Sequence, residues 1–195
     1  MTETVTTTAI SSQIRNRARQ RTYVLDTSVL LSDPRALYRF AEHAVALPVI
    51  VLNELEKKRH DPELGHFARR ALRELDDLRA RHERLDIPVP LTREGGTLHI
   101  EMSQIDEAEL PRELRLGDND TRILAVALNL SQAGFDVTVV SKDLPLRLKA
   151  AAIGLGAEEY RAEQVITHGY SGVDKLAISQ DQITQLWDEG RLVLP

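Results

Sequence analysis

Apolar positions along the chain fall either in short uninterrupted runs or in stripes with helical spacing. Runs bounded by polar residues predict strands at 22–26, 44–47, 98–101, 135–141 and 157–160. Helical stripes and start signals predict helices at 27–31, 34–43, 48–60, 63–82, 119–131 and 144–153. Strands that alternate with helices predict an α/β fold, with a central, mainly parallel sheet of about five strands and helices on both faces.

Changes in composition divide the chain into three parts. Residues 1–20 are polar, rich in threonine and then in arginine, and predict a flexible N-terminal segment. Residues 21–162 hold the regular alternation and predict one domain. Residues 163–195 bring turn residues and short apolar runs, which predict a small C-terminal appendage, either an extension or a linker.

Four acids fall where this fold would bring side chains together. Asp26 ends the first strand and Asp143 follows the strand at 135–141, so both lie at the edge where sites form in parallel sheets. Asp120 shares a helix face with the apolar stripe at 123–128, and a carboxylate buried there is costly unless compensated. Glu54 lies at the edge of an apolar helix face. The pattern predicts a carboxylate cluster.

A cluster of four carboxylates requires positive charge. Two like charges about 4 Å apart cost on the order of 4 kcal/mol at an effective dielectric constant of about 20. Helix N-termini and protons relieve part of this cost, and divalent cations relieve it best. Ligands that are all oxygen favour Mg²⁺ or Mn²⁺ over zinc or copper, and such ions activate water and stabilise the leaving oxygen of a phosphodiester.

Four segments resemble, in order, the motifs of PIN domains: YVLDTSVLL, PVIVLNELEKK, GDNDTRILAVAL and VTVVSKDLPLRLKAAAIGL. The similarity covers about residues 21–160. The early LDTSVLL and the trailing YSGV are similar to PIN domains fused to PhoH-like ATPases. The resemblance implies a PIN-like fold and a Mg²⁺- or Mn²⁺-dependent endoribonuclease that cleaves single-stranded RNA. It also implies that residues 163–195 lead toward an ATPase domain, and it makes a small antitoxin protein a candidate partner.

The resemblance also implies a role for particular residues. It assigns metal binding and catalysis to Asp26, Glu54, Asp120 and Asp143, and Asp118 is a further candidate metal ligand because the third motif holds two acids. The side chains expected to orient these ligands or their waters are Thr27, Ser28, Asn119 and Ser141.

Basic residues near these acids are candidate RNA contacts, because phosphate contacts supply most of the affinity for nucleic acid. They are Lys142, Lys57, Lys58 and Arg59, and the next helix adds Arg69, Arg70 and Arg73. For all of these residues except Lys142, an ordinary solvated helix face explains the positive charges equally well. Taken singly, Asp26, Asp120 and Asp143 could cap helices, and Glu54 could be a solvated helix acid. Asp118 is better placed as a helix cap or as a group outside the metal ligands. Four acids in register with one edge of the fold are harder to explain in that way.

Composition sets limits on location and partners. The net charge of −5 argues against a protein that coats nucleic acid, but not against an enzyme that acts on it. The chain has no cysteine, which excludes disulfides and thiolate chemistry. No apolar run approaches the roughly 20 residues of a membrane span, and no secretory signal is recognisable. We expect a cytoplasmic protein without a membrane partner. The apolar end LVLP indicates a homo-oligomer contact or a chain cut from a longer one.

Two other functions remain open at this stage. A phosphohydrolase of the haloacid dehalogenase type also begins with a strand and an aspartate, but it generally needs a second acid where Ser28 stands. A phosphoaspartate trapped at Asp26 would support it. The other alternative is a non-catalytic RNA-binding or oligomerisation module with a vestigial acid cluster. RNA binding without cleavage in Mn²⁺ would support that reading.

Overall fold

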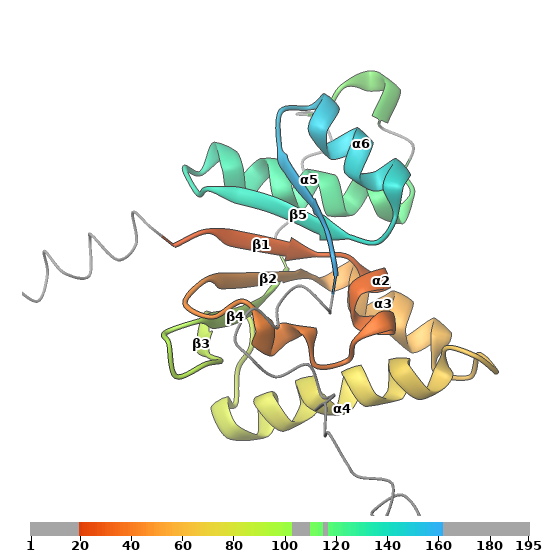
Figure 1. The fold of residues 1–195 in the computed structure, drawn as a ribbon, viewed down its shortest axis with the longest axis vertical. Coiled ribbons are helices and arrows are strands. Elements are labelled where there is room, and N and C mark those ends of the chain that lie inside the picture. Colours follow the sequence, from red (N-terminus) through yellow and green to blue (C-terminus); the bar gives the residue numbers. More distant parts are fainter. Residues whose placement is uncertain (1–19, 103–109, 115–116, 162–195) are drawn as a thin grey trace, which may run out of the picture. The chain divides into compact units, whose positions relative to one another are not determined.

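The computed structural model of the chain describes residues 20–102, 110–114 and 117–161 (Figure 1). The predicted flexible N-terminal segment, apart from Gln20, and the predicted C-terminal appendage lie outside the described residues. The domain boundaries drawn after residues 20 and 162 therefore stay predictions.

Six strands form one sheet in the order β3-β4-β2-β1-β5-β6 (Figure 1). The strands are β1 Thr22–Leu25, β2 Ala44–Pro48, β3 Val89–Pro90, β4 Thr97–Glu101, β5 Val137–Ser141 and β6 Gly156–Glu159. All neighbouring strands are parallel except β3 and β4, which pair antiparallel. The prediction of a mainly parallel α/β sheet is confirmed. The sheet has six strands where about five were predicted, because the two-residue β3 adds one.

Helices flank this sheet, with α4 on the side of β2 and β4, and α5 and α6 on the side of β5 (Figure 1). The α-helices are α2 Thr27–Ser32, α3 Val49–Lys58, α4 Gly65–His82, α5 Asn119–Gln132 and α6 Leu144–Ala152. Two 3₁₀ turns are η1 Ala36–Arg39 and η3 Arg112–Leu114. Among the helices that the structure describes, none is long and apolar enough to cross a membrane.

The core lies between the central strands and one face of each helix. Strands β1 and β5 are buried along their whole length, as expected for parallel strands covered on both faces. Helix α4 contributes Ala68, Ala71, Leu75 and Leu78 to the core. Helical spacing in the sequence predicts one apolar stripe of Phe67, Ala71, Leu75 and Leu78 on this helix. Phe67 does not belong to it, because its side chain is 38% exposed. Both Phe67 and Ala68 have helical spacing to Ala71, and the sequence pattern favoured the larger apolar residue.

The helix predicted at 34–43 is also wrong, since only the 3₁₀ turn η1 forms there. Two interactions explain the short turn: Asp33 accepts hydrogen bonds from the backbone N–H of Arg35 at 3.0 Å and from Nε of Arg39 at 2.6 Å. Ala41 then takes a positive φ of 45°, which reverses the chain into β2. These local contacts override the helical spacing.

The order of the strands places the switch point of the sheet between β1 and β5. From β1 the chain builds β2 and β4 on one side, and it later returns to build β5 and β6 on the other. Ligands of such sheets bind beyond the carboxyl ends of the strands at this switch point. Leu25 is in register with Val140, and the N–H of Asp26 donates to the carbonyl of Val140 at 3.1 Å. Asp26 therefore lies next to Ser141.

Candidate active site

Asp26 lies at the carboxyl end of β1 and is the N-cap of α2, with only 7% of its surface exposed. Its Oδ1 accepts a hydrogen bond from the backbone N–H of Thr27 at 2.6 Å. Its Oδ2 accepts from Ser28 Oγ at 2.5 Å and from Ser141 Oγ at 2.6 Å. All these donors are neutral, and Asp26 has no ion-pair partner among the residues that the structure describes.

Burial raises the pKa of Asp26 above its ordinary range, because water no longer solvates the carboxylate. The hydrogen bonds from Ser141, Ser28 and Thr27 lower this pKa in part, and the nearby charge of Glu54 raises it. A buried acid with a raised pKa and no cation beside it is typical of functional sites, which keep such costly arrangements.

Glu54 reaches this acid from α3, the helix that follows β2. Its Oε2 accepts a short hydrogen bond from Thr27 Oγ1, and its Oε1 accepts one from Asn119 Nδ2 at 2.5 Å. Thr27 therefore contacts both acids, through its N–H to Asp26 and through its hydroxyl to Glu54. Asn119 connects Glu54 to the first turn of α5, where Asp120 follows it.

The loop after β5 is tied to the same hydroxyls. The N–H of Asp143 donates to Ser141 Oγ at 2.9 Å, and the N–H of Lys142 donates to Ser28 Oγ at 3.0 Å. The two hydroxyl oxygens lie 3.3 Å apart. Asp143 is the N-cap residue of α6, but its exposed side chain makes no capping hydrogen bond. The backbone thus holds Asp143 beside Ser141, and its carboxylate makes no hydrogen bond within the described part of the chain.

Asp120 is paired with a residue that the sequence reasoning missed. Its Oδ2 accepts from Lys149 Nζ at 2.9 Å, across from α5 to α6. The hydrogen bond to Asp120, and then the charges of Asp120, Asp118 and Asp143, raise the pKa of Lys149. Helical spacing gave no signal for Lys149, because its role depends on which helix packs beside α5.

Asp118 caps a helix, which is the role that the sequence predicts for it if it does not bind metal. It is the N-cap of α5, and its Oδ1 accepts from the N–H of Thr121 at 2.7 Å. Hydrogen bonding by Thr121 lowers the pKa of Asp118, so its exposed carboxylate stays ionised. One carboxylate oxygen is used by the cap, which leaves the other for the proposed site.

Asp120 pairs with Lys149, and the other three predicted acids lie on one connected network of hydrogen bonds. It runs from Asp143 through Ser141 to Asp26, and from there through Thr27 to Glu54. However, no group of three or more His, Cys, Asp or Glu side chains within residues 20–102, 110–114 and 117–161 is placed to hold a metal ion. The donor chemistry, all oxygen and mostly anionic, fits Mg²⁺ or Mn²⁺. Such an ion would complete its ligands with water or phosphate oxygens.

The predicted RNA contacts all lie on the surface. Lys57, Lys58 and Arg59 are exposed at the C-terminal end of α3, and Lys142 is exposed in the loop after β5. Lys58 pairs with Asp61 at 3.4 Å and Arg59 pairs with Glu56 at 2.7 Å. Lys57 and Lys142 lie in no ion pair within the described part of the chain. Their role in binding stays a prediction.

Known proteins similar to this chain include three that carry the name Protein PhoH2. The chain is 57% identical to that of Thermobispora bispora over 186 residues, 53% identical to that of Mycolicibacterium smegmatis over 174 residues and 41% identical to that of Bacillus subtilis over 179 residues. These matches cover 95%, 89% and 87% of this chain, but only 42%, 40% and 40% of the relatives. The chain therefore spans about two fifths of the length of these relatives.

A comparison with protein families agrees with the fold. Residues 23–161 match the PIN domain, a span that begins in β1 and ends just after β6. The match includes the four acids and the whole described sheet apart from Thr22. The chain belongs to the PIN domain family.

Proposed function

We propose that this chain is the nuclease domain of a PhoH-like protein and that it cleaves single-stranded RNA internally, with Mg²⁺ or Mn²⁺ as cofactor. PIN domains are generally nucleases, and the relatives named PhoH2 match along nearly the whole chain. The observation that carries the proposal is Asp26, a buried carboxylate held by three neutral donors and joined through Thr27 to Glu54.

The chain's own residues have distinct tasks in this proposal. Asp26, Glu54, Asp120 and Asp143 would hold the cation, while Ser28 and Ser141 fix the orientation of the Asp26 carboxylate. When bound, a divalent cation supplies an activated water and positive charge beside the leaving oxygen. Mg²⁺ commonly binds through one or two carboxylates together with waters and substrate phosphates, which suits carboxylates that are not gathered around one point.

The direct test is cleavage of a labelled single-stranded RNA by the purified chain. We expect cleavage in Mn²⁺, none in EDTA, and recovery when excess Mn²⁺ is returned. Asp120→Asn should cleave at least about tenfold more slowly, since even residues that only orient metal ligands are commonly worth 10- to 100-fold, and Asp120 is proposed to hold the cation itself. Double-stranded RNA of the same sequence is the substrate control. Cleavage that persists in EDTA would contradict metal dependence, and equal cleavage of both substrates would contradict strand selectivity.

Lys149 provides a separate prediction about the cation. Lys149 Nζ is 2.9 Å from Asp120 and neutralises charge that a divalent ion would also neutralise. We expect Lys149→Met to bind Mn²⁺ about two- to fivefold more tightly, a small effect because both side chains are roughly a third exposed. Isothermal titration with Mn²⁺ measures it without any catalysis. Lys142→Met, which removes a lysine with no ion pair in the described structure, is the matched control.

Weaker Mn²⁺ binding by Lys149→Met would contradict this prediction and would mean that Lys149 positions Asp120 rather than competes with the ion. A thermal melt of each variant separates either result from unfolding.

Other partners follow from the same proposal. The relatives are longer than this chain, so the ATPase domain toward which residues 163–195 are expected to lead would be part of the full-length protein. Homo-oligomerisation and inhibition by a small antitoxin stay predictions. The match to the PIN domain leaves the haloacid dehalogenase alternative without support. A non-catalytic module would be favoured by RNA binding without cleavage in Mn²⁺.

A further inference from the structure

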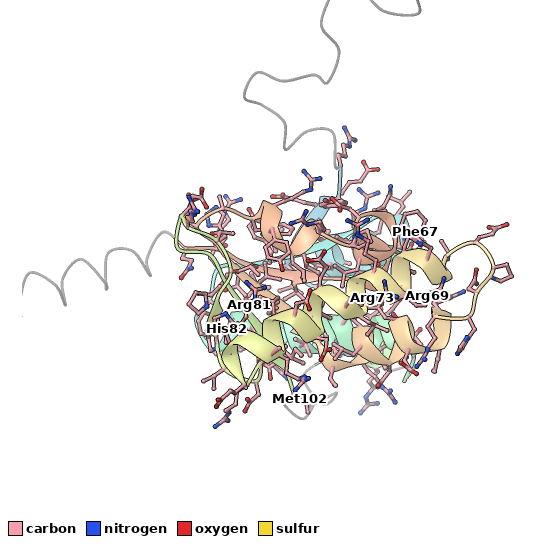
Figure 2. The ribbon with its side chains drawn as sticks, turned by 90° about the horizontal axis from the view of Figure 1, so that it is seen from below. Phe67, Arg69, Arg73, Arg81, His82 and Met102 are labelled. Atoms are coloured by element: carbon pink, nitrogen blue, oxygen red, sulfur yellow. The ribbon has the colours of Figure 1, made fainter. Side chains whose placement is uncertain are left out.

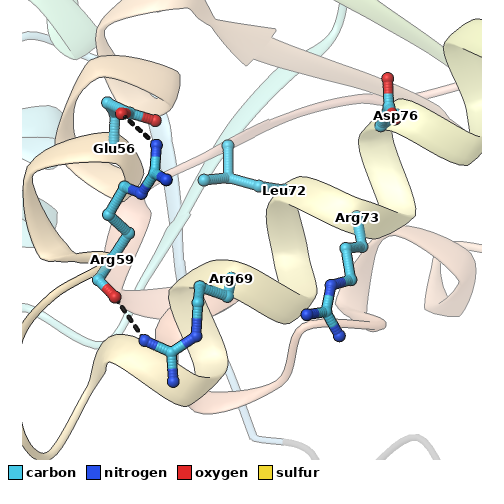
Figure 3. A pocket seen from close by; sticks show the side chains of 6 residues that line it. All are labelled: Glu56, Arg59, Arg69, Leu72, Arg73 and Asp76. Atoms are coloured by element: carbon cyan, nitrogen blue, oxygen red, sulfur yellow. Dashed lines mark hydrogen bonds and ion pairs between the residues drawn. The ribbon is translucent and has the colours of Figure 1, made fainter.

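A groove of about 420 Å³ lies between α3 and α4, outside the carboxylate site (Figure 3). Its lining residues are Glu56, Arg59, Arg69, Leu72, Arg73 and Asp76. A second hollow of about 420 Å³ shares Arg69 and Arg73 with it and so continues the groove over α4. The second hollow is lined by His66, Arg69, Arg70, Arg73, Glu74 and Asp77.

The double groove is lined by four arginines and four acids. Most of the lining acids are already paired with arginines. The pairs join Glu56 to Arg59 at 2.7 Å, Asp76 to Arg79 at 2.8 Å and Glu74 to Arg35 at 3.7 Å. Arg69, Arg70 and Arg73 have no acidic partner within 4 Å among the residues that the structure describes, and Asp77 is the one lining acid left to oppose them. With Arg35 and Arg79 counted as neighbours of the lining, the positive charges around the groove exceed the negative ones by two.

A backbone contact holds Arg69 in place. Its Nη1 donates to the backbone carbonyl of Arg59 at 2.5 Å, across from α4 to the end of α3 (Figure 3). This contact fixes the guanidinium group, and no other hydrogen bond of this group falls within the residues that the structure describes. Arg73 lies one helical turn further along the outward face of α4 (Figure 2). Two guanidinium groups one turn apart form forked donors that suit phosphate groups.

The position of the groove relative to the carboxylates favours a nucleic acid strand. Glu54 and Glu56 are two residues apart on α3, so they face opposite sides of this helix. Glu54 lies in the site, whereas Glu56 lines the groove. The exposed Lys57 and Lys58 occupy the end of α3 between the two sides. A strand that leaves the site can therefore pass this basic helix end and reach Arg69.

We propose that the groove between α3 and α4 binds the phosphate backbone of the RNA, with Arg69 and Arg73 as its main contacts and Arg70 beside them. This proposal rests on the proposed function, because it needs RNA as the substrate. The part nearest α3 is lined by arginines, acids and one leucine, and has no aromatic side chain on which a base could stack. Binding there is therefore independent of base sequence.

The test measures binding of a fluorescent single-stranded RNA by the whole chain in EDTA, where cleavage is expected to stop, over a range of NaCl concentrations. We expect Arg69→Gln/Arg73→Gln to weaken binding about tenfold. The slope of log K against log salt should fall by about 1.4, since each phosphate contact to a single strand contributes about 0.7. Arg84→Gln/Arg93→Gln changes the net charge equally on another part of the surface and should leave binding nearly unchanged.

Arg70→Gln/Arg73→Gln serves as a second variant, because it keeps the hydrogen bond from Arg69 to Arg59. Equal losses in the groove and control variants would mean that only bulk charge acts, and would overturn the proposal. Unchanged RNA binding combined with lost binding of a poly-glutamate peptide would overturn it in favour of an acidic protein partner. Either result leaves the nuclease proposal intact, which Mn²⁺-dependent cleavage tests separately. A wild-type chain that binds and cleaves no RNA would contradict both proposals.

Discussion

Asp26→Asn is expected to slow RNA cleavage by at least about 1000-fold while the chain stays folded. Residues that only orient metal ligands are commonly worth 10- to 100-fold, and Asp26 itself is proposed as a ligand at the centre of the network. A 1000-fold loss corresponds to about 4 kcal/mol of transition-state stabilisation. Asparagine keeps the shape of the side chain and can still accept the hydrogen bond from Thr27, so the N-cap of α2 survives.

The same substitution should not reduce stability at neutral pH. The folded-state pKa of Asp26 is raised, so the folded chain binds this proton more tightly than the unfolded chain. The contribution of Asp26 to stability is therefore fully present below about pH 4 and is lost as the pH rises through the folded pKa. An asparagine side chain does not titrate, so the variant lacks this dependence. At pH 7 we expect Asp26→Asn to unfold at the same temperature as the wild type or higher.

These two expectations are measured together, by cleavage in Mn²⁺ and by thermal unfolding between pH 4 and pH 8. Asp136→Asn is the matched control, because it makes the same chemical change at an exposed residue that pairs only with Arg21, at 3.5 Å, within the described part of the chain. It should leave cleavage unchanged. Undiminished cleavage by Asp26→Asn, with contaminating nuclease excluded by identical purification, would remove Asp26 from the mechanism. A loss of activity with a lower melting temperature would indicate damage to the fold instead.

Much of the fold follows from sequence because buried parallel strands and amphipathic helices leave long, regular patterns. The run before Asp26 and the run before Lys142 both became fully buried strands. Short elements were harder to predict from the sequence. β3 holds only Val89 and Pro90, too few residues for any period, and its pairing with β4 depends on the tertiary fold. The helix expected after Pro34 failed because the side chain of Asp33 stabilises a turn there.

The acids were predictable to different degrees for physical reasons. Strand ends place Asp26 and Asp143, since the carboxyl ends of parallel strands share one edge. The partners that connect the acids were harder to foresee. The contact of Asn119 with Glu54 joins residues 65 positions apart, and that of Lys149 with Asp120 crosses between helices. Such contacts depend on how α3, α5 and α6 pack, which no local pattern encodes.

Two serines, Ser28 and Ser141, donate hydrogen bonds to Asp26. Ser141 also connects two parts of the site, so its substitution is the more informative test. The residue is fully buried at the end of β5. Its Oγ donates to Asp26 at 2.6 Å and accepts from the N–H of Asp143 at 2.9 Å. Ser28 also donates to Asp26, but its second contact is the N–H of Lys142. Loss of Ser141 thus separates Asp26 from Asp143, whereas loss of Ser28 does not.

Ser141→Ala is expected to lower cleavage about 10- to 100-fold and the free energy of unfolding by about 1–3 kcal/mol. The hydrogen bond from Ser141 lowers the pKa of Asp26, so its removal raises that pKa further and moves the acid limb of the pH–rate profile to higher pH. Cleavage rates between pH 5 and pH 9 and urea unfolding measure the two effects. Thr138→Val removes another buried hydroxyl from β5, away from Asp26, and should leave the acid limb in place. An acid limb that stays fixed in Ser141→Ala would show that Ser141 only supports the fold.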